Sequence, residues 1–264
     1  MRLGFSTVMY EGTNLPYPQI IGKAATLGYD GIELNFKGWP SELNLGEIKG
    51  SLNRFNVEIA AIGTRHLYIT HGLYLTSPHK DVRKRALDYV TECMKISRKL
   101  DCSIVQAGWA FQGSKLDAPF DAVWRHAVES LKEAGKRALE HGVHLVIEFA
   151  NRHDAKLVNT MDDALRMLNE IECENVLVMA DIFHIYMEKD PLGETIRKAG
   201  KGLGYVHLAD SDRLVPGRGH IDFQEVINAL KEINYKGYAV MEFTPGPSPD
   251  EALRQAINFI KKHL

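Results

Sequence analysis

The sequence predicts a single (β/α)8 barrel, the fold commonly called a TIM barrel, for residues 1–264. Three observations predict this fold. Short apolar segments alternate with longer amphipathic segments, which favours a parallel sheet covered by helices. Most of the apolar segments are continuously hydrophobic in the middle, as strands buried on both faces should be. No Gly/Ser-rich linker or low-complexity stretch interrupts the alternation, so we expect one domain, and barrels of this kind commonly have about 250 residues.

Eight segments have the composition of strands. They are residues 2–7, 31–36, 58–63, 103–108, 143–149, 176–181, 204–209 and 238–243. The helices between them are bounded by local signals, because glycine after a helix supplies a left-handed cap and Ser or Pro favours a helix start. The stop signals are Leu27-Gly28-Tyr29-Asp30-Gly31, Glu140-His141-Gly142 and Asn234-Tyr235-Lys236-Gly237, with a glycine as the expected cap in each. The start signals are Ser77-Pro78, Pro119 and Ser248-Pro249-Asp250.

Composition excludes several classes of protein. The net charge of −2 gives no basic excess for binding nucleic acid, and no apolar run approaches the roughly 18 residues of a membrane span. The three cysteines are widely spaced and are expected to be reduced core thiols. No nicotinamide fingerprint or Walker loop is present. We therefore expect a cytoplasmic protein without nucleic-acid or membrane partners. A homodimer and a homotetramer are both open as its assembly.

Four consecutive strands, the fifth to the eighth, place an ionisable residue within or just beyond an apolar run. These residues are Glu148, Asp181, His207 and Glu242. Strand carboxyl ends face the active site in such barrels, and buried charges must be compensated. Three carboxylates and one imidazole suit one divalent ion, with Mn²⁺ expected and Mg²⁺ or Co²⁺ as alternatives. Any one residue alone could instead form a strand cap or a salt bridge, but an uncompensated cluster of four would be strongly destabilising.

Five segments carry a family resemblance over essentially the whole chain. They are Glu148 followed by Asn151-Arg152, Asp181-Ile182-Phe183-His184, His207 followed by Arg213, Pro216-Gly217-Arg218-Gly219 before Asp222-Phe223, and Met241-Glu242-Phe243. In these segments the sequence resembles the xylose-isomerase-like barrel superfamily of sugar isomerases and epimerases, and within it the ketose (tagatose and psicose) 3-epimerases. The segments are more specific for the superfamily than for the reaction.

The resemblance implies a divalent-metal-dependent isomerase that moves a proton next to a sugar carbonyl through an enediolate. Glu148 and Glu242 would serve as acid and base on opposite faces of C3, besides binding the metal. His184 would donate a hydrogen bond to a substrate oxygen, and Arg213 would stabilise the developing negative charge.

The sequence departs from the family pattern in two places. His153-Asp154 stands where ketose 3-epimerases usually have an aromatic residue and then glutamate, so Asp154 is the substrate-binding candidate for the C1 end. The first loop lacks a tryptophan often found there. Trp109 is the candidate for an apolar wall beside the sugar, together with Phe5, Trp39 and Phe111.

Several other functions remain open at this stage. Hydroxypyruvate isomerase, inosose dehydratase and enzymes that eliminate the aglycone of C-glycosides share a similar ligand set. An endonuclease-IV-like DNA repair hydrolase needs a trinuclear zinc site with many more strand-end histidines, whereas this chain has only His207 at such a position. A noncatalytic sugar-binding protein is expected to lose a carboxylate, but both Glu148 and Glu242 are present.

Overall fold

The computed structural model describes residues 1–264, apart from the side chain of Ala110. Eight strands close into a barrel in chain order, β1 to β8, which confirms the predicted (β/α)8 fold. Each predicted strand overlaps an observed one. The observed strands are β1 (Arg2–Ser6), β2 (Gly31–Leu34), β3 (Glu58–Ile62), β4 (Ile104–Ala107), β5 (His144–Glu148), β6 (Val176–Asp181), β7 (Leu203–Leu208) and β8 (Tyr238–Met241).

Helices follow the strands along the chain, and short helical turns occupy several of the loops at strand ends. The α-helices are α1 (Tyr17–Leu27), α2 (Leu45–Phe55), α3 (Arg65–Ile69), α4 (Lys80–Lys99), α5 (Trp109–Gln112), α6 (Phe120–Glu140), α7 (Met161–Ile171), α8 (Ile182–Met187), α9 (Leu192–Ala199), α10 (Phe223–Glu232) and α11 (Pro249–Ile260). The 3-10 helices are η1 (Thr7–Tyr10), η2 (Pro40–Glu42) and η3 (Gly200–Gly202).

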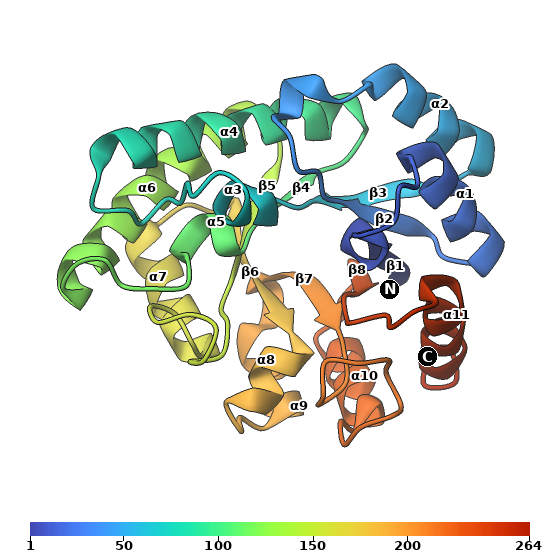
Figure 1. The fold of residues 1–264 in the computed structure, drawn as a ribbon. Helices are drawn as coiled ribbons and strands as arrows, with labels where there is room; N and C mark the ends of the chain where they lie inside the picture. The colour runs from blue at the N-terminus through green and yellow to red at the C-terminus, as the bar shows by residue number, and fades with distance from the viewer. The chain divides into compact units, whose positions relative to one another are not determined.

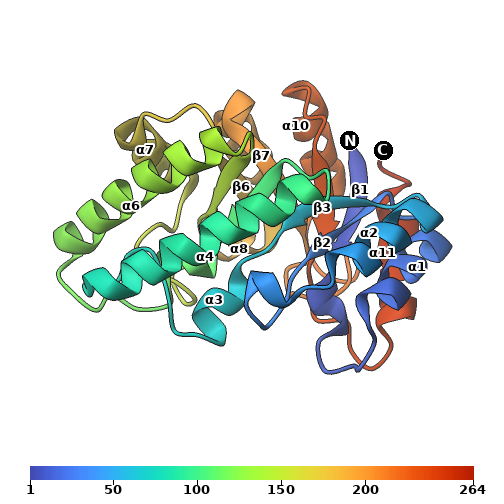
Figure 2. The same ribbon diagram turned by 90° about the horizontal axis from the view of Figure 1, so that it is seen from above.

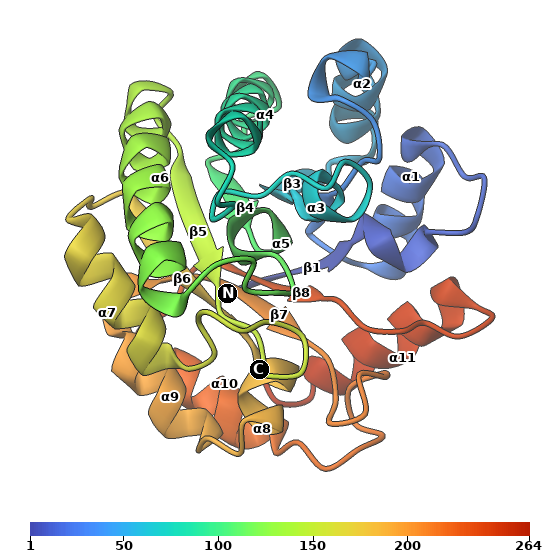
Figure 3. The same ribbon diagram turned by 60° about the vertical axis from the view of Figure 1, so that its left-hand side comes forward.

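The chain divides into two compact units. The first comprises residues 1–34, 44–60 and 180–264. In it β1 pairs in parallel with both β2 and β8, and β7 pairs with β8. Helix α1 packs against α2 and α11, and α9 packs against α10 (Figures 1 and 3). At Gly31 a Cβ atom would lie 2.9 Å from the carbonyl oxygen of Glu58, so only glycine allows this close approach of backbones.

The second unit comprises residues 35–43 and 61–179. In it β4 pairs in parallel with β3 and β5, and β5 pairs with the first part of β6. The long helices α4 and α6 run side by side, and α7 packs against α6 (Figure 2). A reciprocal capping box begins α7, because Thr160 accepts from the backbone N–H of Asp163 and the Asp163 side chain accepts in return.

Most of the predicted helix boundaries are confirmed. Gly28 and Gly142 have φ of 83° and 64°. The prediction for Gly237 is wrong, because Asn234, which has a φ of 57°, takes the left-handed position instead. Asparagine tolerates this conformation better than other side chains do. Ser248 precedes Pro249 at the start of α11, and Pro119 precedes α6.

Two of the three cysteines expected in the core are buried in the structure. All three thiols are free, Cys93 and Cys102 are buried, and Cys173 is partly buried. Among the residues that the structure describes, no helix combines the length and apolar character needed to cross a membrane.

Candidate active site

His207, in β7, has two different environments at its two ring nitrogens. Its side chain is fully buried, and Nδ1 lies 3.4 Å from Oε2 of Glu242, the residue that follows β8. Within the part of the chain that the structure describes, Nδ1 makes no hydrogen bond of normal geometry. Buried polar atoms nearly always have a hydrogen-bond partner. A buried ring nitrogen without such a partner, beside a carboxylate, is therefore suited to bind a cation.

The other ring nitrogen contacts a carboxylate that the sequence analysis missed. Nε2 of His207 lies 2.7 Å from Oε2 of Glu33, in β2. The second oxygen of Glu33 accepts a hydrogen bond of 2.8 Å from the hydroxyl of Ser6. Glu33 is fully buried in an apolar strand. The sequence signal that could have identified it is a glutamate inside an apolar strand segment, because a charge buried in such a strand requires a partner.

The electrostatics of this cluster favour positive charge. Burial alone lowers the pKa of His207, but the negative charges of Glu33 and Glu242 raise it well above its ordinary value. Ligand atoms of these three side chains all lie within 4.8 Å of one another. Within this group, Nδ1 of His207 and the carboxylate of Glu242 face each other and are suited to bind a divalent metal ion.

Arg213 joins two of the predicted ligands. Its guanidinium lies 3.0 Å from Oδ2 of Asp181, at the end of β6, and 2.6 Å from Oε2 of Glu242. It also lies 4.8 Å from the ring centre of Phe183. Asp181 is fully buried, and its Oδ1 accepts from the backbone N–H of Phe183, which caps α8. The helix cap therefore orients the other oxygen toward Arg213.

The first turn of α8 also brings His184 to this cluster. Its Nε2 lies 3.8 Å from Oδ2 of Asp181, and the ring is buried. Five of the residues predicted from the sequence therefore lie together in the first unit. They are Asp181, His184, His207, Arg213 and Glu242.

The loop after β7 is built around Asp210, a second residue that the sequence analysis missed. Its fully buried carboxylate accepts from four backbone N–H groups, those of Ser211, Gly217, Arg218 and Ile221. The loop holds Arg213 in the left-handed conformation, with a φ of 57°. The backbone of Arg213 is tied at both ends, since its N–H donates to the carbonyl of Asp210 and its carbonyl accepts from Thr244.

We expect Asp210→Asn to destabilise the protein by about 2 kcal/mol at neutral pH, because an amide NH2 would face backbone donors. Burial raises the pKa of Asp210, but hydrogen bonds from the backbone lower it below its ordinary value. A carboxylate whose pKa is lower in the folded state stabilises the fold at pH values above the ordinary pKa of aspartate. This stabilisation is lost as the pH falls through the lowered pKa.

Urea unfolding of wild type and Asp210→Asn between pH 7 and pH 3 measures this effect. The difference in free energy of unfolding should shrink toward low pH. Asp212→Asn, in the exposed part of the same loop, is the matched control. A difference that stays constant with pH would contradict the role assigned to the Asp210 charge.

In the second unit, Glu148 ends β5. Gly108, which follows β4, leaves space for the carboxylate, because a Cβ atom there would lie 2.3 Å from Oε2 of Glu148. The side-chain amide of Gln112, in α5, donates to the main-chain carbonyl of Glu148 at 3.1 Å. The end of β5 is thus held by α5, the short helix that follows β4.

The remaining candidates also belong to the second unit. Asp154 accepts a hydrogen bond of 2.7 Å from the side chain of Asn151. The ring of Trp109 stacks on that of Tyr68, with centroids 5.9 Å apart. Trp39 packs edge-on against Tyr89. Of the other two expected aromatic residues, Phe111 is fully buried in this unit and Phe5 is fully buried in the first unit.

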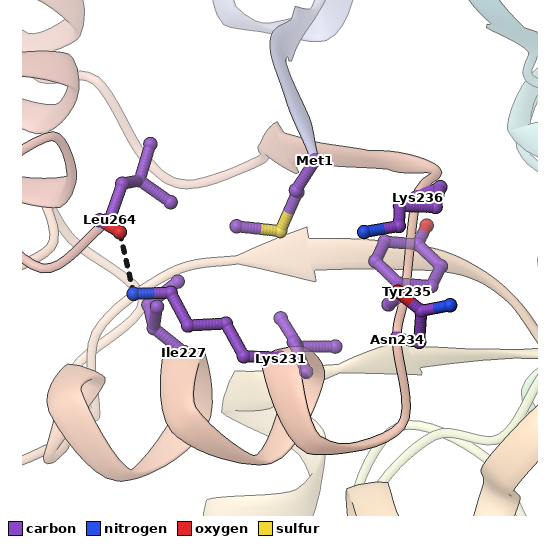
Figure 4. Close-up of a pocket in the computed structure, with 8 residues that line it drawn as sticks. Met1, Ile227, Lys231, Asn234, Tyr235, Lys236 and Leu264 are labelled. Atoms are coloured by element: carbon purple, nitrogen blue, oxygen red, sulfur yellow. Dashed lines mark hydrogen bonds between the residues drawn. The ribbon is translucent and has the colours of Figure 1, made fainter.

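A cavity of about 410 Å³ lies elsewhere in the first unit (Figure 4). Its lining comes from α10, the segment between α10 and β8, and the two ends of the described chain. The lining residues are Met1, Ile227, Leu230, Lys231, Asn234, Tyr235, Lys236 and Leu264. They lie where β1 and β8 begin, whereas the chemistry of such barrels lies where strands end. This cavity is therefore not the candidate active site.

The fold and the site define a class of protein: a (β/α)8 barrel with ionisable side chains gathered where its strands end. The family described as xylose isomerase-like TIM barrel matches residues 21–263, and the chain belongs to it.

Similar proteins include sugar epimerases. D-psicose 3-epimerase of Ruminiclostridium cellulolyticum is 33% identical over 86% of this chain and 78% of that protein. L-ribulose 3-epimerase of Mesorhizobium japonicum is 28% identical over 89% and 78%. The solved structure of D-psicose 3-epimerase with D-tagatose from Clostridium cellulolyticum H10 has a TM-score of 0.87 and 27% identity, covering 100% of this chain and 99% of that one. The resemblance to ketose 3-epimerases is therefore confirmed.

Proposed function

We propose that this protein is a divalent-metal-dependent ketose 3-epimerase. One observation carries the proposal: the buried, unpaired Nδ1 of His207 faces Glu242, which Arg213 joins to Asp181. Its similarity to D-psicose and L-ribulose 3-epimerases supports the same chemistry, which belongs to the isomerase class. The barrel is proposed to be one domain over residues 1–264.

The proposed metal ligands are Glu148, Asp181, His207 and Glu242. Their oxygen-rich set suits Mn²⁺, with Mg²⁺ or Co²⁺ as alternatives. Glu148 is included because it ends β5, as Asp181 ends β6, and strand ends carry the active site in this fold. A bound divalent ion would polarise the substrate carbonyl and stabilise the negative charge that develops beside it.

The side chains then divide the proton transfer at C3 between them. One of Glu148 and Glu242 removes the C3 proton and becomes protonated, and the other, carrying a proton from solvent, donates it to the opposite face, which inverts the centre. Arg213 orients Glu242 through its hydrogen bond of 2.6 Å and contributes positive charge near the reacting oxygens.

The other candidates bind the sugar. His184 donates a hydrogen bond to a substrate oxygen, Asp154 contacts the C1 end, and Trp109 supplies an apolar surface. We propose a small sugar as the substrate, a cytoplasmic location, and a homodimer or homotetramer in solution.

Incubation of the Mn²⁺-loaded protein with a panel of ketoses in D2O tests the proposal. NMR should show formation of the C3 epimer with deuterium at C3, and chelation should stop it. Formation of an aldose with deuterium at C2 would indicate an aldose–ketose isomerase instead. Loss of water would indicate a dehydratase, and release of an aglycone would indicate a C-glycoside-eliminating enzyme.

A further inference from the structure

We propose that Glu33 is a positioning residue that fixes the ring of His207 so that Nδ1 is the metal-binding nitrogen. The inference rests on the proposed function, because it takes His207 as a metal ligand. It adds a residue that the family resemblance of the sequence did not indicate. Glu33 acts on the metal through the imidazole and is not itself a ligand.

A buried chain of hydrogen bonds supports this role. The hydroxyl of Ser6 donates to Oε1 of Glu33 at 2.8 Å, and Oε2 of Glu33 lies 2.7 Å from Nε2 of His207. All three side chains are fully buried. A carboxylate accepts hydrogen bonds and does not donate them, so Nε2 must carry a proton. In the neutral ring, Nδ1 then carries the lone pair that a metal ion requires.

The position of the other carboxylates distinguishes this arrangement from one in which Glu33 is itself a ligand. Glu242 lies beside Nδ1, at 3.4 Å, and Arg213 connects Glu242 to Asp181. Glu242 and Asp181, the two proposed carboxylate ligands in this unit, therefore lie on the Nδ1 side of the imidazole ring. Glu33 lies at Nε2, and one of its oxygens is already engaged there.

The consequence is a gain in metal affinity. A carboxylate that accepts from a ligating histidine orients the ring and makes it a better electron donor, and loss of such a partner typically weakens metal binding by about 10- to 100-fold. The same contact excludes the tautomer with the proton on Nδ1, in which Nδ1 has no lone pair to bind the ion.

Two variants and one spectrum test the proposal. Glu33→Leu removes the acceptor at similar volume and should weaken Mn²⁺ binding by about 10- to 100-fold, as measured by the EPR signal of free Mn²⁺. Glu33→Gln can still accept through its carbonyl oxygen, so it should lose less affinity. In the Mg²⁺-loaded wild type, ¹⁵N NMR of labelled histidine should show His207 with the proton on Nε2.

Controls separate this inference from simple loss of stability. Ile227→Ala creates a cavity in the buried face of α10 and should lower the melting temperature without changing the affinity for Mn²⁺. If Glu33→Leu does not fold, the wild-type spectrum still decides the matter. Wild-type affinity in folded Glu33→Leu, or a proton on Nδ1 in the loaded wild type, would overturn the proposal.

The failure of the proposed function would look different. In that case the wild-type protein itself would fail to bind Mn²⁺ or to epimerise any ketose. Tight binding by the wild type together with unchanged binding in the Glu33 variants would reject only the role of Glu33.

Discussion

Replacing either Glu148 or Glu242 by glutamine is expected to abolish epimerisation while the barrel remains folded. Inversion at C3 requires one group that removes the proton and another that returns it on the opposite face, so neither glutamate can replace the other. General acid–base groups typically contribute about 10²- to 10⁴-fold to a rate, and loss of one should reduce kcat by at least this much. Glutamine keeps an oxygen that can contact a metal ion, so some metal should remain bound with lower affinity.

Isotope exchange makes this prediction sharper. In D2O, a variant with one remaining base should still exchange the C3 proton of one epimer without inverting it, since that base removes and returns the proton on its own face. The two variants should therefore act on opposite epimers. NMR of each purified epimer with each variant measures this difference.

The matched control is Glu225→Gln, the same chemical change in α10, where the carboxylate accepts from the backbone N–H of Gly193. It should leave turnover unchanged. Full turnover in Glu148→Gln or Glu242→Gln, with the metal still bound, would show that the proposed acid/base pair is wrong.

Asp181→Asn should give the largest loss of metal affinity among the conservative substitutions in the first unit. Asp181 is fully buried and contacts the N-terminus of α8, Arg213 and His184. Asparagine keeps the shape but removes the charge, and its NH2 group would face either the helix or the guanidinium. Loss of an outer hydrogen-bond partner already costs about 10- to 100-fold in affinity, so loss of a direct ligand should cost at least as much.

A second aspartate provides the control for the helix cap. Asp222 begins α10 by accepting from the backbone N–H groups of Gln224 and Glu225. Asp222→Asn makes the same change at a helix cap outside the cluster, and it should leave Mn²⁺ binding intact. If Asp181→Asn binds Mn²⁺ as tightly as Asp222→Asn does, Asp181 is not a ligand.

Local patterns in the sequence were enough to predict the barrel. Each strand is a short apolar run with its own turn signals, and burial on both faces leaves a pattern that can be read within a few residues. The ionisable residues Glu148, Asp181, His207 and Glu242 could be selected in the same way, because each interrupts or follows such a run. The residue that caps a helix was harder to predict, because Asn234 and not Gly237 takes the left-handed conformation after α10.

The sequence by itself therefore determined the eight strands, their order and the residues at their ends. Only the tertiary structure decided which of those residues meet. Glu33 and His207 are 174 positions apart in the sequence, and Arg213 and Asp181 are 32 positions apart. Asp210 accepts four backbone hydrogen bonds because its loop folds back around the carboxylate. Such contacts depend on how parallel strands bring distant segments together, and hydrophobic periodicity reports burial but does not identify the partner of a buried charge.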